Sequence, residues 1–155
     1  MATYVNNLRL KEIATGDESG TWGTSTNTNL ELIGQGLGYG TKQMAADSNE
    51  TFTMADGAAD STRAFYLKIT SAVSLTTTRT VTLAPNTVSK MWIVENATSG
   101  AQSINIKQGS GNEVTIATGK AVILYTDGAG ATGAVNDALQ FVDVGDGTPK
   151  LAVVK

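Results

Sequence analysis

Apolar and polar residues alternate in short stretches through residues 51–155, and each stretch ends at Gly, Asn, Asp or Ser. Because the side chains of a strand point alternately to its two faces, such a stretch predicts a half-buried antiparallel strand. The clearest stretches are residues 65–69, 80–83, 104–107 and 114–116. Turn residues fall about ten positions apart, and we find no internal repeat of fixed period. We therefore expect a mainly β fold, an antiparallel sandwich or jelly-roll-like domain.

Two further stretches are apolar on both faces. Residues 91–94 read Met-Trp-Ile-Val, and residues 121–125 read Ala-Val-Ile-Leu-Tyr. Strands of this kind belong in the middle of the packing or beneath a neighbouring subunit. We expect a subunit interface that includes Trp92 and Tyr125, because aromatic side chains bury large apolar areas where they pack.

A helical pattern precedes these strands. Leu30, Ile33 and Leu37 follow the i, i+3, i+7 spacing of one helix face, and Thr24 or Ser25 is placed to cap the first turn. Glycines at positions 34, 36 and 38 weaken this helix, since each glycine inside a helix costs about 1 kcal/mol relative to Ala. The short helix must therefore be held by packing against something else, such as another chain.

The chain thus divides into two parts. We expect residues 1–40 to form an N-terminal anchoring segment with a short helix, and residues 41–155 to form the antiparallel β-domain. The anchoring segment is predicted to be loosely ordered in the free protein and to become fixed when it inserts between subunits or into a larger assembly. Trp22 adds a large apolar area just before the helix.

Composition narrows the classes of function. A chain of 155 residues with net charge −3 and only 11 scattered Lys and Arg residues lacks the clustered positive charge that nucleic acid requires. Histidine and cysteine are absent, which removes the commonest general base and the soft-metal ligands. No apolar run approaches the roughly 20 residues that cross a bilayer. We expect no enzymatic activity, no cofactor, no metal and no membrane insertion.

Two motifs are better explained by turns than by ligands. Residues 128–133 match G-x-G-x-x-G after a strand, but a dinucleotide site also needs a helix, a second parallel strand and an acidic residue about 20 positions further on. We therefore predict a hairpin loop there. Asp127, Asp137, Asp143 and Asp146 carry oxygen ligands suited to calcium, yet they match no EF-hand spacing, and tight turns favour Asp beside Gly.

Three stretches carry a resemblance to a known class of proteins. Residues 8–17 lead into Gly-Thr-Trp-Gly at 20–23 and Asn-Thr-Asn-Leu at 27–30; the other two stretches are residues 90–100 and 122–128. Together they resemble structural proteins of tailed bacteriophages, of the kind found among fibre-associated proteins of marine and cyanobacterial phages.

The resemblance implies a non-enzymatic virion protein with a β-rich protomer that forms a homotrimer. It implies docking through the N-terminal segment on other phage structural proteins of the tail or capsid, and we expect Trp22, Asn27, Asn29, Leu30 and Ile33 to make those contacts. Fibre proteins of this kind usually continue into a shaft and a receptor-binding tip, whereas this sequence ends at residue 155. We therefore expect a short tail fibre or adaptor, or a capsid-decoration protein.

The alternative is a carbohydrate-binding module that uses exposed Trp, Tyr and Asn side chains on loops to hold host-surface glycans. The two interpretations differ in what they require of Trp92. An exposed Trp92 favours the glycan module, and a buried Trp92 favours the structural protein.

Overall fold

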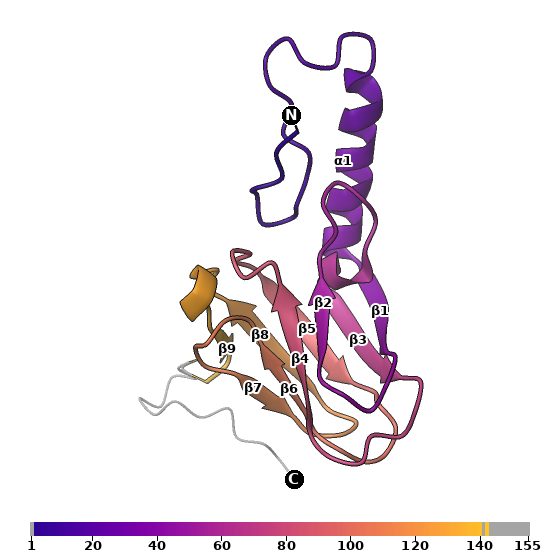
Figure 1. Cartoon of the computed structure of the whole chain (residues 1–155), viewed down its shortest axis with the longest axis vertical. Helices are drawn as coiled ribbons and strands as arrows, with labels where there is room; N and C mark the ends of the chain where they lie inside the picture. Colours follow the sequence, from indigo (N-terminus) through magenta and orange to yellow (C-terminus); the bar gives the residue numbers. More distant parts are fainter. Residues whose placement is uncertain (1, 141, 143–155) are drawn as a thin grey trace.

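A computed structural model describes residues 2–140 and 142 of the chain. Helix α1 (Trp22–Leu37) stands above a body of strands, and the segment before it lies alongside the helix (Figure 1). The strands of the described residues are β1 (Tyr39–Met44), β2 (Glu50–Thr53), β3 (Tyr66–Ser71), β4 (Arg79–Ala84), β5 (Met91–Asn96), β6 (Ile104–Lys107), β7 (Val114–Ile116), β8 (Ala121–Thr126) and β9 (Val135–Asp137), with short 3-10 turns η1 (Ser61–Arg63) and η2 (Gly130–Thr132).

The strands form two sheets, with orders β1-β3-β5-β8-β9 and β2-β4-β6-β7. Successive strands from β1 to β6 join the two sheets in alternation, and each pairs in parallel with the next strand of its own sheet. The chain therefore coils through three turns of two strands each. Strands β7, β8 and β9 then close the two sheets with antiparallel pairs.

This topology corrects part of the sequence-based prediction. The mainly β body with a helix before it is confirmed, but among the named strands of the described residues only β5–β8, β6–β7 and β8–β9 pair antiparallel. The strand order also differs from a jelly roll, which is built from antiparallel Greek keys. Alternation of apolar and polar residues marks a strand and its buried face, but it carries no information about the direction of the neighbouring strand.

Inward side chains of both sheets share one core. Trp92 is the largest of the fully buried side chains, with 1% of its surface exposed, and its indole nitrogen donates to the carbonyl of Thr62 at 2.9 Å. The buried apolar residues around it are Met44, Phe52, Met54, Leu67, Ile69, Leu75, Val81, Leu83, Val88, Val94, Ile104, Ile106, Ile116, Leu124 and Val135.

Helix α1 is longer than predicted. It begins at Trp22, with Thr21 as the N-cap, so Thr24 and Ser25 lie inside the first turns. Gly36 is buried, and a Cβ atom there would come within 3.0 Å of the Leu8 side chain. This glycine therefore lets the N-terminal segment approach the helix closely, which offsets its low helix propensity.

The turns between the sheets stack on one another at one edge of the body. Gly100, in the turn from β5 to β6, has φ of 99°, and a Cβ atom there would overlap the carbonyl oxygen of Leu75 in the turn from β3 to β4. The Leu75 amide donates to the Ser99 carbonyl at 2.9 Å. Gly119 also has a positive φ, 68°, but nothing lies within 4 Å of a Cβ built on it.

We predict that Gly100→Ala destabilises the protein much more than Gly119→Ala. Both variants place a side chain at positive φ, which costs roughly 1–2 kcal/mol, and only Gly100→Ala adds a clash with the backbone of the neighbouring turn. Chemical denaturation of the two variants measures the difference. Equal losses would contradict the stacked turns.

Candidate functional site

Helix α1 presents an apolar stripe to solvent. Trp22, Leu30, Ile33 and Leu37, which we name the α1 stripe, are 63%, 60%, 36% and 76% exposed. At 3.6 residues per turn these four side chains fall within an arc of about 80° on the helix surface. The stripe predicted from the sequence is therefore real, and it points away from the protein's own core.

Three residues of the stripe, Leu30, Ile33 and Leu37, have the spacing of a coiled coil. Thr26, Leu30, Ile33 and Leu37 follow one another by steps of four, three and four residues, which places Leu at heptad position a and Ile at position d. The flanking e and g positions hold Asn at 27 and 29 and Gly at 34 and 36, none of them charged. Copies of this helix would thus meet uncharged residues at the e positions, Asn27 and Gly34, whereas the g positions Asn29 and Gly36 lie against the chain's own N-terminal segment.

Another face of α1 is covered by the chain's own N-terminal segment. Leu32 is buried there. The side-chain amide of Asn29 accepts from the Lys11 backbone nitrogen at 3.0 Å and donates to the Lys11 carbonyl at 2.8 Å. Of the two asparagines predicted to contact a partner, Asn29 is thus engaged within the chain, whereas Asn27 is exposed.

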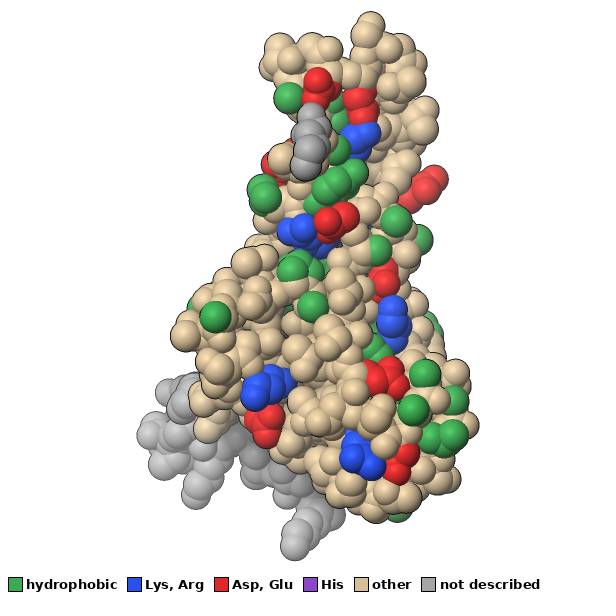
Figure 2. All heavy atoms as spheres, in the orientation of Figure 1, with side chains coloured by type: hydrophobic (Ala, Val, Ile, Leu, Met, Phe, Trp, Pro, Cys, Tyr) green, Lys and Arg blue, Asp and Glu red, His purple; other side chains and the backbone are tan. Residues whose placement is uncertain are grey.

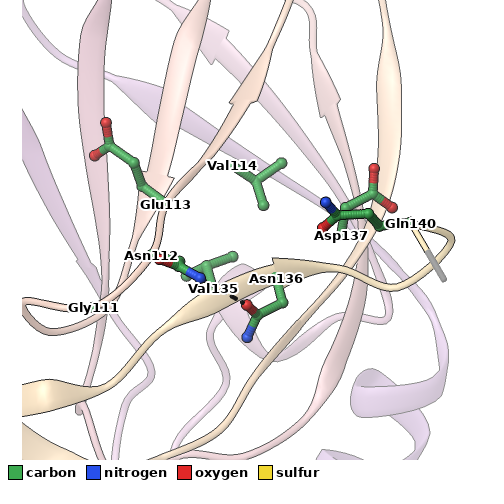
Figure 3. Close-up of a pocket in the computed structure, with 8 residues that line it drawn as sticks. All are labelled: Gly111, Asn112, Glu113, Val114, Val135, Asn136, Asp137 and Gln140. Atoms are coloured by element: carbon green, nitrogen blue, oxygen red, sulfur yellow. Dashed lines mark hydrogen bonds between the residues drawn. The ribbon is translucent and has the colours of Figure 1, made fainter.

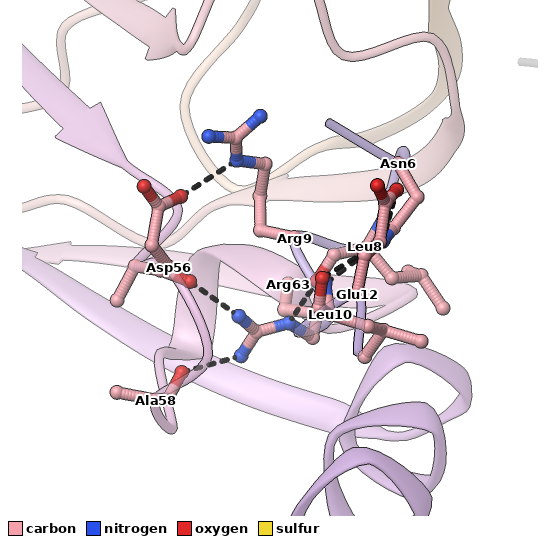
Figure 4. A network of polar contacts seen from close by, with 9 residues as sticks. Asn6, Leu8, Arg9, Leu10, Glu12, Asp56, Ala58 and Arg63 are labelled. Atoms are coloured by element: carbon pink, nitrogen blue, oxygen red, sulfur yellow. Dashed lines mark hydrogen bonds and ion pairs between the residues drawn. The ribbon is translucent and has the colours of Figure 1, made fainter. Parts of the chain in front are cut away.

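The buried side chain of Arg63 joins helix α1 to the rest of the chain by hydrogen bonds. The Arg63 guanidinium is fully buried and donates to the carbonyls of Leu8 (2.8 Å) and Ala58 (2.8 Å) (Figure 4). It also donates to the carbonyl of Ala55 (2.6 Å) and to the side-chain oxygen of Gln35 on α1 (2.7 Å). Burial lowers the pKa of Arg63 from its ordinary value, and the charges of Asp60 and Asp56 oppose that effect.

Further contacts fix the N-terminal segment on the body. Arg9 pairs with Asp56 at 2.7 Å, and its carbonyl accepts from the Gly57 nitrogen at 2.8 Å (Figure 4). The Asn7 side chain accepts from the Ser89 nitrogen at 2.9 Å. These contacts favour an attached segment over the loosely ordered one expected from the sequence.

The five-stranded sheet carries a second apolar surface on the side away from the core. Its members, which we name the outer sheet face, are Tyr39, Tyr66, Met91, Ile93, Ile123 and Tyr125. Tyr39 pairs with Tyr66, Tyr66 with Ile93, and Ile93 with Ile123, which makes one row across four strands; Met91 pairs with Tyr125 beside it. The rings of Tyr39 and Tyr66 lie 5.7 Å apart.

Charged residues border this row. Lys68 and Glu95 form an ion pair at 3.2 Å, and the Tyr66 hydroxyl donates to Glu95 at 2.9 Å. These bonds raise the pKa values of Tyr66 and Lys68. Along the chain the row continues toward the α1 stripe, because Leu37 and Tyr39, both strongly exposed, are separated only by Gly38.

The outward side chains of the four-stranded sheet are polar instead. Thr51 pairs with Thr82, Thr82 with Lys107, and Thr80 with Asn105. The two sheets are wound from the same coil and share one core, yet only one of them has an apolar outer face. On the side of the molecule seen in Figure 2, acidic and basic side chains lie next to one another, and hydrophobic side chains are scattered among them.

The two aromatic residues predicted at a subunit interface are placed differently. Tyr125 belongs to the outer sheet face and is 39% exposed. Trp92 points inward from β5 into the core, so its side chain is not available to a neighbouring subunit. The strand is apolar on both faces as predicted, but its outward residues are Met91 and Ile93.

The glycine-rich motif forms a loop between β8 and β9, an antiparallel pair, as expected of a hairpin. Its glycines allow close backbone contact with the loop after β6: the Gly109 and Gly111 nitrogens both donate to the Gly133 carbonyl, at 2.8 and 3.1 Å. The Asp127 carboxylate accepts from the Ala134 and Ala129 nitrogens, which holds its pKa below the usual range.

The other acidic residues do not gather into a metal centre in the described part of the chain, where no three Asp, Glu, His or Cys side chains cluster. Asp137 accepts from the Leu139 nitrogen at 2.8 Å, as a turn residue does. Asp143 and Asp146 lie outside the described residues.

A polar hollow of about 670 Å³ opens between the edges of the two sheets, beside β7 and β9. Figure 3 shows Val114 between Glu113 on one side and Asp137 and Gln140 on the other. The lining residues are Gly111, Asn112, Glu113, Val114, Val135, Asn136, Asp137 and Gln140. Sequence reasoning missed this site, because its residues come from two separate stretches and form no motif.

Lys90 occupies an unusual position beside the core. Its ammonium lies 4.1 Å from the centre of the Trp92 ring and donates to the carbonyls of Met91 (3.1 Å) and Ala64 (3.4 Å). Burial, with a smaller contribution from the charge of Arg63, lowers the pKa of Lys90 to about 7.

Comparisons with family models, curated proteins and solved structures found no match to this chain. Within residues 2–140 and 142, no helix combines the length and apolar character that crossing a membrane requires.

We predict that Arg63→Met lowers the free energy of unfolding by about 3 kcal/mol or more, because it removes four hydrogen bonds donated by a buried guanidinium, and hydrogen bonds that involve a charged group contribute about 1.5–3 kcal/mol each. Arg79→Met is the control, since it removes only the partly exposed pair with Asp47 and should change stability far less. Urea denaturation measures both. Similar losses would contradict the role given to Arg63.

We also predict that stability rises with pH above 7 in a manner that depends on Lys90. Between pH 7 and the ordinary value of 10.5 the unfolded chain holds a proton on Lys90 that the folded protein has released. The free energy of unfolding therefore increases, by at most about 1.4 kcal/mol per pH unit from this group. Denaturation at pH 7 and pH 9 should show a smaller increase for Lys90→Met than for the wild type. Identical increases would contradict the lowered pKa.

Proposed function

We propose that the protein is a non-enzymatic structural subunit of a tailed-phage virion that assembles as a homotrimer through the α1 stripe and the outer sheet face. The observation that carries the proposal is the unpartnered apolar surface that these two features form around Leu37 and Tyr39. Large apolar patches on a protomer mark sites of association.

The heptad spacing of α1 indicates that the partner covering this apolar surface is a second and third copy of the chain. Leu at a and Ile at d in a coiled coil favour three or four strands over two, and the uncharged flanking positions suit identical neighbours. The stripe alone is too short for a stable coiled coil, because its heptad spacing runs over about two heptads, fewer than the three or four that mark a coiled coil. The outer sheet face supplies the additional area that a permanent interface needs, which is commonly 2,000 Å² or more.

The virion location rests on the resemblance of residues 8–30, 90–100 and 122–128 to phage structural proteins. The burial of Trp92 supports a structural protein over a glycan module that stacks sugar on that ring. Trp22 stands at the end of α1 far from the sheets (Figure 1), where it is free to contact other phage proteins of the tail or capsid. The protein then serves as a short tail fibre or adaptor, or as a capsid-decoration protein.

Light scattering of the purified chain should report three copies per particle at micromolar concentration. The double variant Ile33→Glu, Leu37→Glu should be monomeric, because it buries unpaired carboxylates in the interface. Thr24→Glu adds a charge to an exposed position of α1 away from the stripe and should remain trimeric. Circular dichroism checks that each variant retains its fold.

The same variants test the location. Thr24→Glu should enter phage particles at the wild-type level, and the double variant should be missing from them, as measured by mass spectrometry of purified virions. A stable wild-type monomer would overturn the trimer. Normal incorporation of the double variant would overturn attachment through this surface.

A further inference from the structure

The polar hollow beside β7 and β9 lies away from the α1 stripe and borders the outer sheet face where Asn136 pairs with Tyr125. It lies at the other end of both sheets from β1 and β2, next to the last antiparallel strands. We propose that this hollow binds a neutral saccharide of one or two sugar units.

The lining chemistry matches sugar hydroxyls. The amides of Asn112, Asn136 and Gln140 both donate and accept hydrogen bonds, and the carboxylates of Glu113 and Asp137 accept them. Each sugar hydroxyl also donates and accepts, so a ring with adjacent hydroxyls can satisfy several of these groups at once. No Lys or Arg lines the described hollow, so it offers no counter-charge to an anionic ligand.

The polar side chains are already oriented by their own chain. Glu113 accepts from the Asn105 amide at 2.9 Å, and Asp137 accepts from the Leu139 nitrogen at 2.8 Å, each through one oxygen. The other oxygen of each carboxylate has no hydrogen-bond partner among the described residues. The Asn112 amide donates to the side-chain oxygen of the adjacent Asn136 at 3.4 Å (Figure 3). A ligand therefore meets groups that are partly fixed, which reduces the entropy lost on binding.

Apolar residues complete the site. Val114 is half-buried among the polar groups, and its exposed part provides surface for the C–H face of a sugar ring; Val135 lies beneath it in the core. The hollow of about 670 Å³ falls within the usual range for small-ligand sites, roughly 300–1,000 Å³. Calcium is less suited, because it takes 6–8 oxygen ligands and both carboxylates already share their charge with donors of the chain.

Nuclear magnetic resonance of the ¹⁵N-labelled full chain tests the proposal, with D-glucose, D-galactose and N-acetyl-D-glucosamine as probes at millimolar concentration. We expect at least one of these sugars to give saturable shifts of the amides at residues 111–114 and 135–137. Asn136→Ala and Gln140→Ala should each weaken that binding at least about fivefold, because each removes a hydrogen bond to a hydroxyl. Asn86→Ala, an exposed asparagine outside the hollow, should leave it unchanged.

Three results would overturn the proposal. The first is that none of the three sugars shifts these amides. The second is that the shifts persist unchanged in both hollow variants. The third is that calcium chloride or the acidic sugar N-acetylneuraminic acid shifts the same amides as strongly as the neutral sugars. The two proposals are tested by different variants, because the interface variants change Ile33 and Leu37 on α1 and the hollow variants change Asn136 and Gln140.

Discussion

The position of helix α1 depends on one buried cation. Arg63 joins Leu8 of the N-terminal segment, Gln35 of the helix and the carbonyls of Ala55 and Ala58 in the loop after β2. A guanidinium has five donors in a fixed plane, so it holds all of these acceptors in one geometry. Without it these acceptors would lose a charged donor, and α1 would lose a hydrogen bond at Gln35 that joins it to the body.

This attachment determines which face of the helix remains open. Asn29 and Gly36 lie against the N-terminal segment, and a side chain at position 36 would crowd Leu8. The apolar stripe of Leu30, Ile33 and Leu37 cannot turn inward at the same time, because the two faces are fixed relative to one another by the helix itself. The protomer therefore keeps an apolar surface that burial within one chain cannot remove.

The sequence predicts part of this arrangement. The spacing of Leu30, Ile33 and Leu37 gave the helix and its stripe, and alternation gave most of the strands, since both patterns are local. The sequence did not reveal the coiling of the chain between the two sheets. In the five-stranded sheet, residue 39 pairs with 66 and 66 with 93, so that successive strands are 27 residues apart. In the four-stranded sheet, residue 50 pairs with 81 and 79 with 104, which are steps of 31 and 25 residues. Turns of unequal length hide such a repeat. The role of Arg63 in holding α1 carries no local signal, because Leu8 and Gln35 lie 55 and 28 residues away, and the hollow combines two separate stretches of the chain.

The contrast between the two sheets is the strongest reason to expect partners. Strands from both sheets face the same core, so their inward side chains are apolar in both sheets. Their outward side chains differ in polarity, because the outer faces of the two sheets have different surroundings. Thr51, Thr80 and Thr82 suit water, whereas Tyr39, Met91 and Ile93 do not. The apolar outer face of the five-stranded sheet continues into the α1 stripe. This arrangement is expected of a chain that buries that side against copies of itself. The polar hollow at the far edge of the sheets is then left for a different kind of ligand, one that exchanges water for hydrogen bonds.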